Sequence, residues 1–213
     1  MSKFATQELR KKYAGQTLLK LKKLFPNARM FLNYETPFEL LVAVMLSAQC
    51  TDKKVNEVTP ALFEKYKTVD DYARASIKDL ERLVYQTGFY HAKAKHIKEA
   101  AKVVRDEFKG QLPRTMKDML RIPGVGRKTA NVVLGNIYGV SEGIAVDTHV
   151  RRLSYVLGFS KEKAIPAIER DLMRLFPRKE WFRLTYYLIE YGRLYCPAKK
   201  HDHSMCPLGH IDG

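Results

Sequence analysis

The sequence predicts an all-helical protein. Apolar residues recur at three- and four-residue spacing in six segments, and the alternation and hairpin turns typical of strands are missing. Breakers rich in proline and glycine separate the segments. The predicted helices cover residues 7–25, 37–48, 53–65, 77–85, 92–108 and 127–137, and the breakers lie at 26–27, 36–37, 87–88, 110–113, 123–124 and 141–143.

Composition and charge narrow the class of partner. The chain has 213 residues, 46% of them hydrophobic and 11% aromatic, which excludes a disordered basic tail. Lysine and arginine number 38 against 23 acidic residues, so the net charge of +15 favours a polyanion such as nucleic acid or an anionic membrane. The longest apolar run, at 40–46, is too short to span a membrane, and the N-terminus lacks a signal core. We therefore expect a cytoplasmic protein without membrane contact.

The most informative segment is residues 120–130, which read LRIPGVGRKTA. A predicted helix at 115–121 ends at Pro123, a glycine turn follows, and a second helix begins at Arg127. Gly124 and Gly126 allow a tight bend and leave amide groups uncovered at a helix N-terminus, while Val125 can pack between the helices. This pattern is typical of a helix-hairpin-helix, which holds a DNA backbone phosphate; a turn within the core is the alternative.

Two further residues point to chemistry. Lys128 lies on the first turn of the second helix, where the dipole and the charge of Arg127 favour a neutral, nucleophilic amine. Asp147 ends an apolar run, IAV, and precedes another predicted helix. Its carboxylate can cap that helix and still be rigidly aimed at a reacting group. The alternative for Lys128 is a plain phosphate contact.

Four blocks make the chain similar to a known family: PFELLVAVMLSAQCTD at 37–52, TGFYHAKAKHI at 87–97, LPRTMKDMLRIPGVGRKTANVVL at 112–134 and IAVDTHVRRL at 144–153. The chain resembles the endonuclease III family of DNA glycosylases, within the helix-hairpin-helix glycosylase superfamily. The resemblance implies a two-lobed helical fold. A six-helix barrel would occupy 30–140, and residues 1–29 with 141–213 would form a second helical lobe. It also implies a monomer that binds damaged double-stranded DNA, associated with the nucleoid in a prokaryote.

The resemblance implies an activity as well as a fold. Lys128 matches the family's catalytic lysine and Asp147 its catalytic aspartate, so the chain would be a bifunctional base-excision-repair DNA glycosylase and AP lyase. It would remove oxidised pyrimidines through a Schiff base and cut the strand by β-elimination. A glycosylase for mismatched or alkylated bases and a non-enzymatic DNA-binding module are the alternatives.

The resemblance also assigns DNA contacts. Gln49 matches a glutamine that enters the duplex beside the vacated position. Phe89 stands where the family has an apolar wedge, with a core residue as the alternative. Lys93 and Lys95 are predicted backbone contacts, with solvated side chains as the alternative. Gly124, Val125, Gly126 and Arg127 form the phosphate-binding hairpin.

The C-terminal tail departs from the family. Most members hold a [4Fe–4S] cluster with four cysteines, and the corresponding positions here are Cys196, His203, Cys206 and Asp212. Because aspartate suits such a site poorly, the favoured expectation is a loop without metal, held by packing. A cluster, or zinc bound by the two cysteines with two of His201, His203 and His210, is an alternative. The lyase chemistry itself requires no metal.

Overall fold

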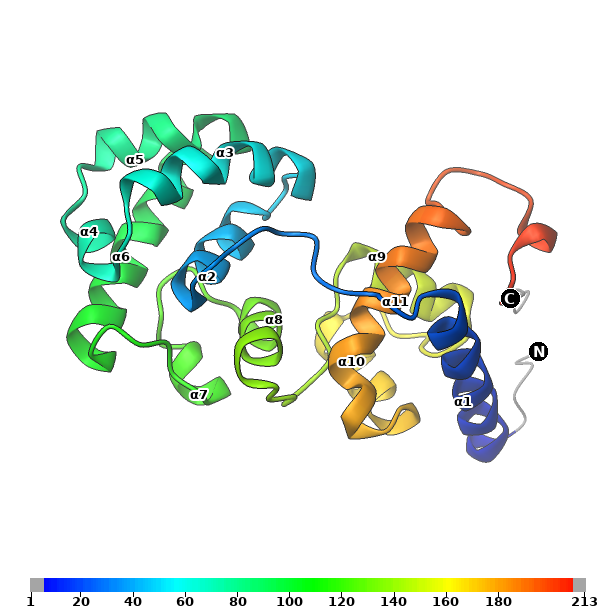
Figure 1. Ribbon diagram of the computed structural model, residues 1–213. Coiled ribbons are helices and arrows are strands. Elements are labelled where there is room, and N and C mark those ends of the chain that lie inside the picture. The colour runs from blue at the N-terminus through cyan, green and yellow to red at the C-terminus, as the bar shows by residue number, and fades with distance from the viewer. Residues whose placement is uncertain (1–5, 209–213) are drawn as a thin grey trace. The chain divides into compact units, whose positions relative to one another are not determined.

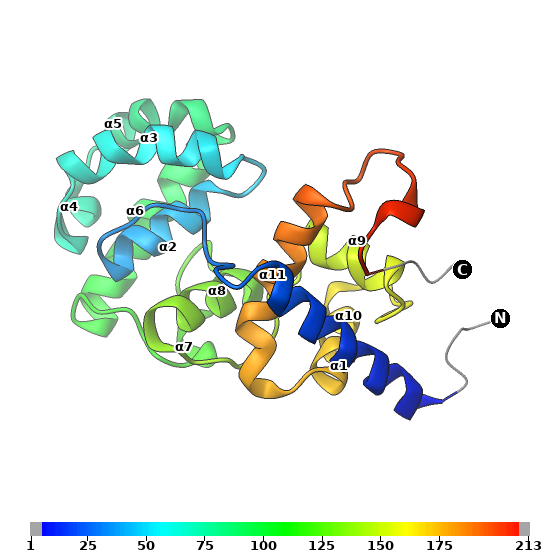
Figure 2. The ribbon, with the colours of Figure 1, turned by 45° about the vertical axis from the view of Figure 1, so that its right-hand side comes forward.

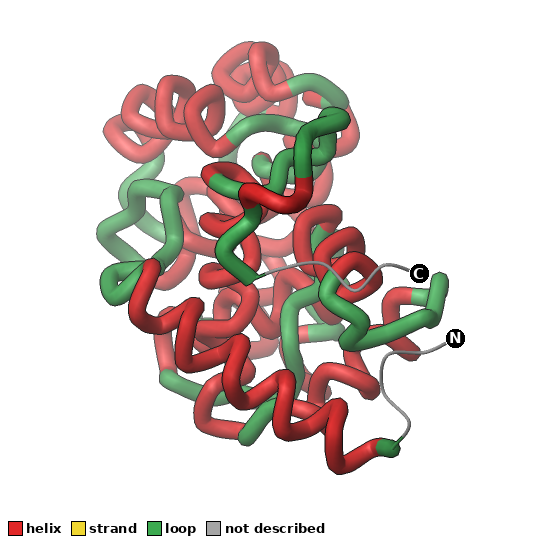
Figure 3. Tube along the Cα trace, turned by 90° about the vertical axis from the view of Figure 1, so that its right-hand side faces the viewer, coloured by secondary structure: helices red, strands yellow, loops and turns green. Residues whose placement is uncertain are grey.

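The protein is described here by a computed structural model that covers residues 6–208. Every regular element within that range is a helix, which confirms the all-helical prediction (Figure 3). The chain divides into two compact units. Unit 2 comprises residues 31–140, and unit 1 combines the N-terminal segment up to Met30 with the chain from Ser141 onward.

Unit 2 is built around α2 (Pro37–Leu46), which packs against α3, α6 and α8 (Figure 1). All residues from Phe38 to Leu46 are buried, which explains why the sequence is apolar around the whole helix. A capping box between Thr36 and Glu39, followed by Pro37 at the first position, fixes where α2 begins. The other elements of unit 2 are α3 (Asp52–Lys65), α4 (Val69–Arg74), α5 (Ile77–Val84), η1 (Tyr85–Thr87), α6 (Tyr90–Phe108), α7 (Met116–Met119) and α8 (Arg127–Tyr138).

Several helix boundaries in unit 2 differ from the predicted ones, and α6 begins two residues before the predicted 92. Helix α2 ends two residues before the predicted 48, because the chain turns at Ser47 and Gln49 takes a left-handed conformation. Helix α7 is shorter than the predicted 115–121, because Thr115 is its N-cap and Leu120 its C-cap. Helix α4 was not predicted; it has six residues, too few to show a helical period, and a capping box at Thr68 starts it.

Unit 1 contains α1 (Gln7–Leu24), α9 (Thr148–Val156), α10 (Ile165–Leu175), η2 (Arg178–Glu180), α11 (Trp181–Leu194) and η3 (His203–Met205). Helix α1 lies beside α10 and α11, so the two ends of the sequence fold together (Figure 2). Its core includes the fully buried rings of Phe159, Tyr187 and Tyr191, and both tail cysteines, Cys196 and Cys206, belong to it. No helix in residues 6–208 has the length and apolar character needed to cross a membrane.

Candidate active site and its supporting loops

The glycine turn between α7 and α8 is fixed by close packing. Gly124 has a φ of +77°, and a Cβ there would lie 2.7 Å from Cε of Met45 and 2.9 Å from Cβ of His96. Any other residue would meet both a strained backbone and a clash. Gly126 differs, because it has an ordinary φ of −95° and a Cβ would have open space. Gly124 is therefore needed for the shape of the turn, whereas Gly126 leaves the surface at the start of α8 accessible.

Helix α8 presents a suitable N-terminus for an anion. Its N-cap, Gly126, offers no side chain to the first-turn amides, and that turn contains no acidic residue. Arg127 and Lys128 are both exposed there. The helix dipole, an N-cap without a side chain and two cationic side chains all favour a phosphate at this point.

Val125 is buried, as expected of a residue that packs between the helices, so its place among the predicted DNA contacts needs correction. Its side chain is buried, and its amide donates a hydrogen bond of 3.1 Å to the carbonyl oxygen of Ile122. Both groups are therefore used inside the turn, and Val125 supports the hairpin instead of contacting a phosphate.

Asp147 in unit 1 caps α9, as the sequence suggested. Its Oδ1 accepts a hydrogen bond of 2.8 Å from the amide of Val150. Residues 144–146, which precede Asp147, are buried and hydrogen-bonded to two other segments of unit 1. Thr185 Oγ1 donates to the carbonyl oxygen of Ala145 at 3.0 Å, and the Ile144 amide donates to Oε1 of Glu169 at 3.2 Å. The backbone before Asp147 is thus held by the core, and the half-buried carboxylate has a defined direction.

Gln49 and Phe89 share an unusual backbone conformation. Both are exposed, and their φ angles of 53° and 49° lie in the left-handed region that non-glycine residues rarely adopt. The Phe89 side chain is 65% exposed, so the alternative of a core residue is wrong. Strained, exposed residues of this kind cluster at functional sites.

Lys93 is wrongly placed among the predicted DNA contacts. It is 6% exposed, and its Nζ donates hydrogen bonds of 2.8 Å to the carbonyl oxygen of Leu46 and 2.7 Å to that of Thr87. Burial lowers the pKa of Lys93, while the nearby Cys50 thiol acts in the opposite direction. Lys95, two residues on, is exposed, and its Nζ lies 4.0 Å from Oε1 of Glu99, so it remains a predicted DNA contact.

Three loops of unit 2 converge on one pair of helices. The Lys93 ammonium joins the end of α2, just before Gln49, to the chain just before Phe89. One turn further along α6, His96 packs under Gly124, and Met45 of α2 reaches the same glycine. The hairpin, the Gln49 loop and the Phe89 loop are therefore supported by the C-terminal end of α2 and the N-terminal half of α6.

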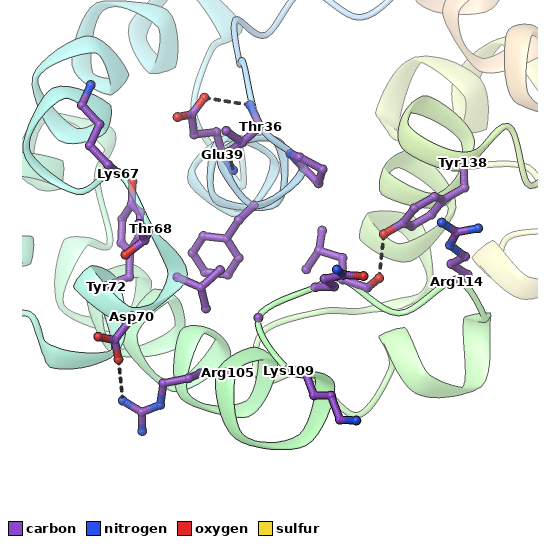
Figure 4. A pocket seen from close by; sticks show the side chains of 16 residues that line it. Thr36, Glu39, Lys67, Thr68, Asp70, Tyr72, Arg105, Lys109, Arg114 and Tyr138 are labelled. Atoms are coloured by element: carbon purple, nitrogen blue, oxygen red, sulfur yellow. Dashed lines mark hydrogen bonds and ion pairs between the residues drawn. The ribbon is translucent and has the colours of Figure 1, made fainter.

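A cavity of about 700 Å³ in unit 2 lies elsewhere (Figure 4). It opens at the N-terminal end of α2, where Thr36 and Phe38 line it, and extends to Tyr138, whose hydroxyl donates to the carbonyl oxygen of Leu112 at 2.6 Å. None of the predicted site residues lines this cavity, so it takes no part in the candidate site.

The tail of unit 1 gathers four possible metal ligands: Cys196, His201, His203 and Cys206. Their ligand atoms all lie within 4.8 Å of one another, and both cysteines are buried. Of the four positions taken from the family's spacing, Cys196, His203 and Cys206 belong to this set. Asp212 lies outside the described residues, as does His210, and His201 supplies the fourth donor.

The donor set does not fit a [4Fe–4S] cluster. In such a cluster each ligand binds a different iron at a corner of a cube, so the ligands stand well apart, and they are thiolates. Here two imidazoles replace thiolates and all four donor atoms crowd into the space of a single ion. No step of the chemistry below therefore involves a cluster.

Comparisons with known proteins agree with this arrangement. A family model described as "HhH-GPD superfamily base excision DNA repair protein" matches residues 42–178. Endonuclease III of Synechocystis sp. is 46% identical, over 95% of this chain and 92% of its own length. Endonuclease III of Bacillus subtilis is 43% identical, over 89% and 86% respectively.

A solved structure of a trapped covalent endonuclease III–DNA intermediate superposes with a TM-score of 0.88 at 42% identity, covering 93% of each chain. The chain therefore belongs to the HhH-GPD superfamily of base excision DNA repair proteins and, within it, to the endonuclease III family.

Proposed function

We propose that this protein is a bifunctional DNA glycosylase and AP lyase that removes oxidised pyrimidines from duplex DNA. The observation that carries the proposal is the exposed Lys128 on the first turn of α8, directly after a glycine turn suited to a phosphate. Membership of the endonuclease III family supports the same chemistry, and the relative with a trapped covalent DNA complex shows that this fold can form such an intermediate.

Binding begins at the backbone of the damaged strand. The amides at the α8 N-terminus and the Arg127 side chain hold a phosphate without reading sequence. The damaged nucleotide is turned out of the duplex, and Gln49 and Phe89 fill the space that it leaves. Their strained backbone positions are tolerated because Lys93 ties both loops to the unit 2 core.

The chemical step uses Lys128 as the nucleophile. Its neutral amine attacks C1′ of the deoxyribose, a C1′–N bond forms, and the bond to the base breaks with the electron pair leaving on the base. Asp147 stabilises the positive charge that develops on the sugar and accepts the proton lost by the attacking amine. Ring opening then yields a protonated Schiff base between Lys128 and C1′.

Strand cleavage follows from that Schiff base. The iminium withdraws electrons, so a C2′ proton is removed and the C3′–O bond breaks with the electron pair leaving on the 3′ phosphate. Hydrolysis of the imine by water releases Lys128. The same amine thus takes part in base removal and in strand cleavage. The proposed location is the nucleoid in the cytoplasm of a prokaryote, and the proposed active form is a monomer.

Borohydride trapping tests this proposal directly. Wild-type protein mixed with thymine-glycol or abasic duplex is expected to form a covalent adduct, and Lys128→Ala is expected to form none. Lys20→Ala, which changes an exposed lysine on α1 with no predicted DNA contact, should trap like the wild type. A wild type that forms no adduct with any damaged duplex would disprove the lyase mechanism.

Asp147→Asn separates catalysis from helix capping. Asparagine caps a helix about as well as aspartate, so stability should stay within about 0.5 kcal/mol of the wild type. Base release should nevertheless fall at least tenfold, because the carboxylate charge is lost.

A panel of duplexes with oxidised, alkylated and mismatched bases, assayed in parallel, tests the lesion class. Preference for an alkylated or mismatched base would contradict the assignment to oxidised pyrimidines.

A further inference from the structure

We propose that the C-terminal tail of unit 1 binds a single tetrahedral zinc ion through Cys196, His201, His203 and Cys206. This inference does not depend on the proposed enzymatic activity, because none of these residues takes part in the chemistry of Lys128. It differs from the cluster of the wider family in both the metal and the number of metal atoms.

The distances between the donor atoms suit one small ion. Sγ of Cys206 lies 3.4 Å from Nε2 of His201 and 3.9 Å from Nδ1 of His203, and the four ligand atoms lie within 4.8 Å of one another. With Zn–S bonds of about 2.3 Å and Zn–N bonds of about 2.0–2.1 Å, tetrahedral geometry places ligand atoms roughly 3.4–3.8 Å apart. The donors are therefore already close to the separation that zinc requires.

His201 is oriented as a metal ligand should be. Its Nδ1 lies 2.8 Å from the carbonyl oxygen of Lys199, and that contact requires Nδ1 to carry the hydrogen. In the neutral ring the lone pair is then on Nε2, which is the atom that faces Cys206. A metal-binding histidine commonly has its other nitrogen fixed by a backbone carbonyl in this way.

Arg152 of α9 holds Cys196 in position. Its Nη1 donates to Sγ of Cys196 at 3.5 Å, and its Nη2 donates to the carbonyl oxygen of the same residue. Space for this guanidinium exists because position 192 in α11 is glycine; a Cβ there would lie 3.2 Å from Nη2. Such outer-shell hydrogen bonds orient a metal ligand.

Charge and burial agree with a structural role for the ion. Two thiolates and two neutral imidazoles balance the two charges of Zn²⁺, and Cys196 and Cys206 are 0% and 5% exposed. Four protein ligands leave no open position for water or substrate, as in structural zinc sites. The tail has little regular structure apart from η3, so a metal would connect residues 196–206 to the core.

The soft donors also exclude other common ions. Magnesium and calcium prefer oxygen ligands in larger coordination shells, which thiolates and imidazoles do not supply.

Metal analysis of the full-length protein, purified after expression with both zinc and iron supplied, tests the inference. We expect one zinc per chain, a colourless protein, and the visible bands of tetrahedral Co²⁺ with thiolate ligands after cobalt exchange. Iron with the brown colour of a cluster, or failure to bind either Zn²⁺ or Co²⁺, would overturn it.

Variants of a single donor make the test independent of folding. His201→Ala should weaken zinc affinity at least tenfold in competition with a chelator, whereas His201→Cys keeps four donors and should retain one zinc. His91→Ala, which changes an exposed histidine of α6 in unit 2, is the matched control and should bind zinc like the wild type. Chelation should lower the Tm of the wild type by roughly 10 °C, and zinc but not magnesium should restore it. Equal zinc affinity in His201→Ala and wild type would contradict the assigned ligand set.

Discussion

The loops of unit 2 and the tail of unit 1 are held in place by different chemistry. In unit 2 a buried ammonium, Lys93, donates to two backbone carbonyls and supports the Gln49 and Phe89 loops. In unit 1 the tail brings together two thiols and two imidazoles around Cys206. The Lys93 connection is complete within the chain, because its ammonium donates to the carbonyl oxygens of Leu46 and Thr87. The second consists of four groups that can each give an electron pair to a cation, so the proposed zinc ion would connect all four at once.

The difference shows why two surface segments respond differently to solution conditions. A lysine that is buried and hydrogen-bonded stays in place at any metal concentration, so the loops predicted to enter DNA are permanently supported. The tail gains its fourfold connection only with a bound ion, so its stability should depend on metal supply.

Lys93→Met should destabilise the protein most. Methionine fills similar space but leaves the carbonyl oxygens of Leu46 and Thr87 without their donor, which we expect to cost about 3 kcal/mol. For a chain of this size that lowers the Tm by roughly 6–12 °C in thermal unfolding monitored by circular dichroism. Lys95→Met, on the exposed face of the same helix, should change stability by less than about 0.5 kcal/mol. Zinc content should remain that of the wild type in both variants, and a loss of zinc in Lys93→Met would break the contrast.

Gly124→Ala should have the next largest effect. Alanine at a φ of +77° is strained, and its Cβ would collide with Met45 and His96, for an expected loss of about 2 kcal/mol in urea unfolding. Gly126→Ala should leave stability within about 0.5 kcal/mol, because its Cβ meets nothing within 4 Å. It should nevertheless weaken duplex binding, since the methyl group covers the α8 N-terminus. If Gly126→Ala binds DNA as tightly as the wild type, the hairpin does not hold the phosphate there.

Gly192→Ala should affect the tail more than the fold. The new Cβ would lie 2.7 Å from Nδ1 of His149 and 3.2 Å from Nη2 of Arg152, and both side chains can move. Displacing Arg152 from Cys196 should weaken zinc binding about tenfold in chelator competition, as loss of an outer-shell partner does. Gly15→Ala is the control, because its Cβ has open space in α1; it should raise stability by about 0.5–1 kcal/mol without changing zinc affinity. Zinc affinity that is unchanged in Gly192→Ala would remove Arg152 from the site.

The smallest effect is expected for Phe89→Gly. Glycine relieves the left-handed backbone at φ 49°, so stability should change by no more than about 1 kcal/mol, and in the favourable direction. Affinity for a duplex with an abasic site should fall, because the exposed ring is lost; fluorescence anisotropy measures both duplexes, damaged and intact. A Phe89→Gly protein with unaltered affinity for the damaged duplex would show that the ring does not enter the DNA.

The salt dependence of affinity for intact duplex tests the proposed contacts with the DNA backbone. With a net charge of +15, log affinity should fall linearly with log salt, by about 0.9 for each phosphate neutralised. Arg127→Ala should reduce that slope by about one phosphate, whereas Lys93→Met should leave it unchanged because its ammonium is buried. Binding that is insensitive to salt would contradict the proposed backbone contacts.

Much of the fold follows from local sequence. The helices α1, α3 and α8 begin at the predicted residues or within one of them, because apolar periodicity and terminal breakers act over a few residues. The unit boundary at 31–140 differs by one residue from the expected 30–140. The short α4 escaped prediction because one and a half turns carry no period and its stability comes from a capping box and from burial of Tyr72.

The sequence by itself determined the helical class, the glycine turn before Lys128, the capping position of Asp147 and the likeness to the endonuclease III family. All of these depend on neighbours along the chain, where residue type restricts the backbone directly. The tertiary structure decided that Lys93 is buried, that Phe89 is exposed and that His201 joins Cys196, His203 and Cys206. Those outcomes depend on which distant segments come together, and a lysine or histidine has the same local preferences whether it finally meets solvent, a carbonyl oxygen or a metal.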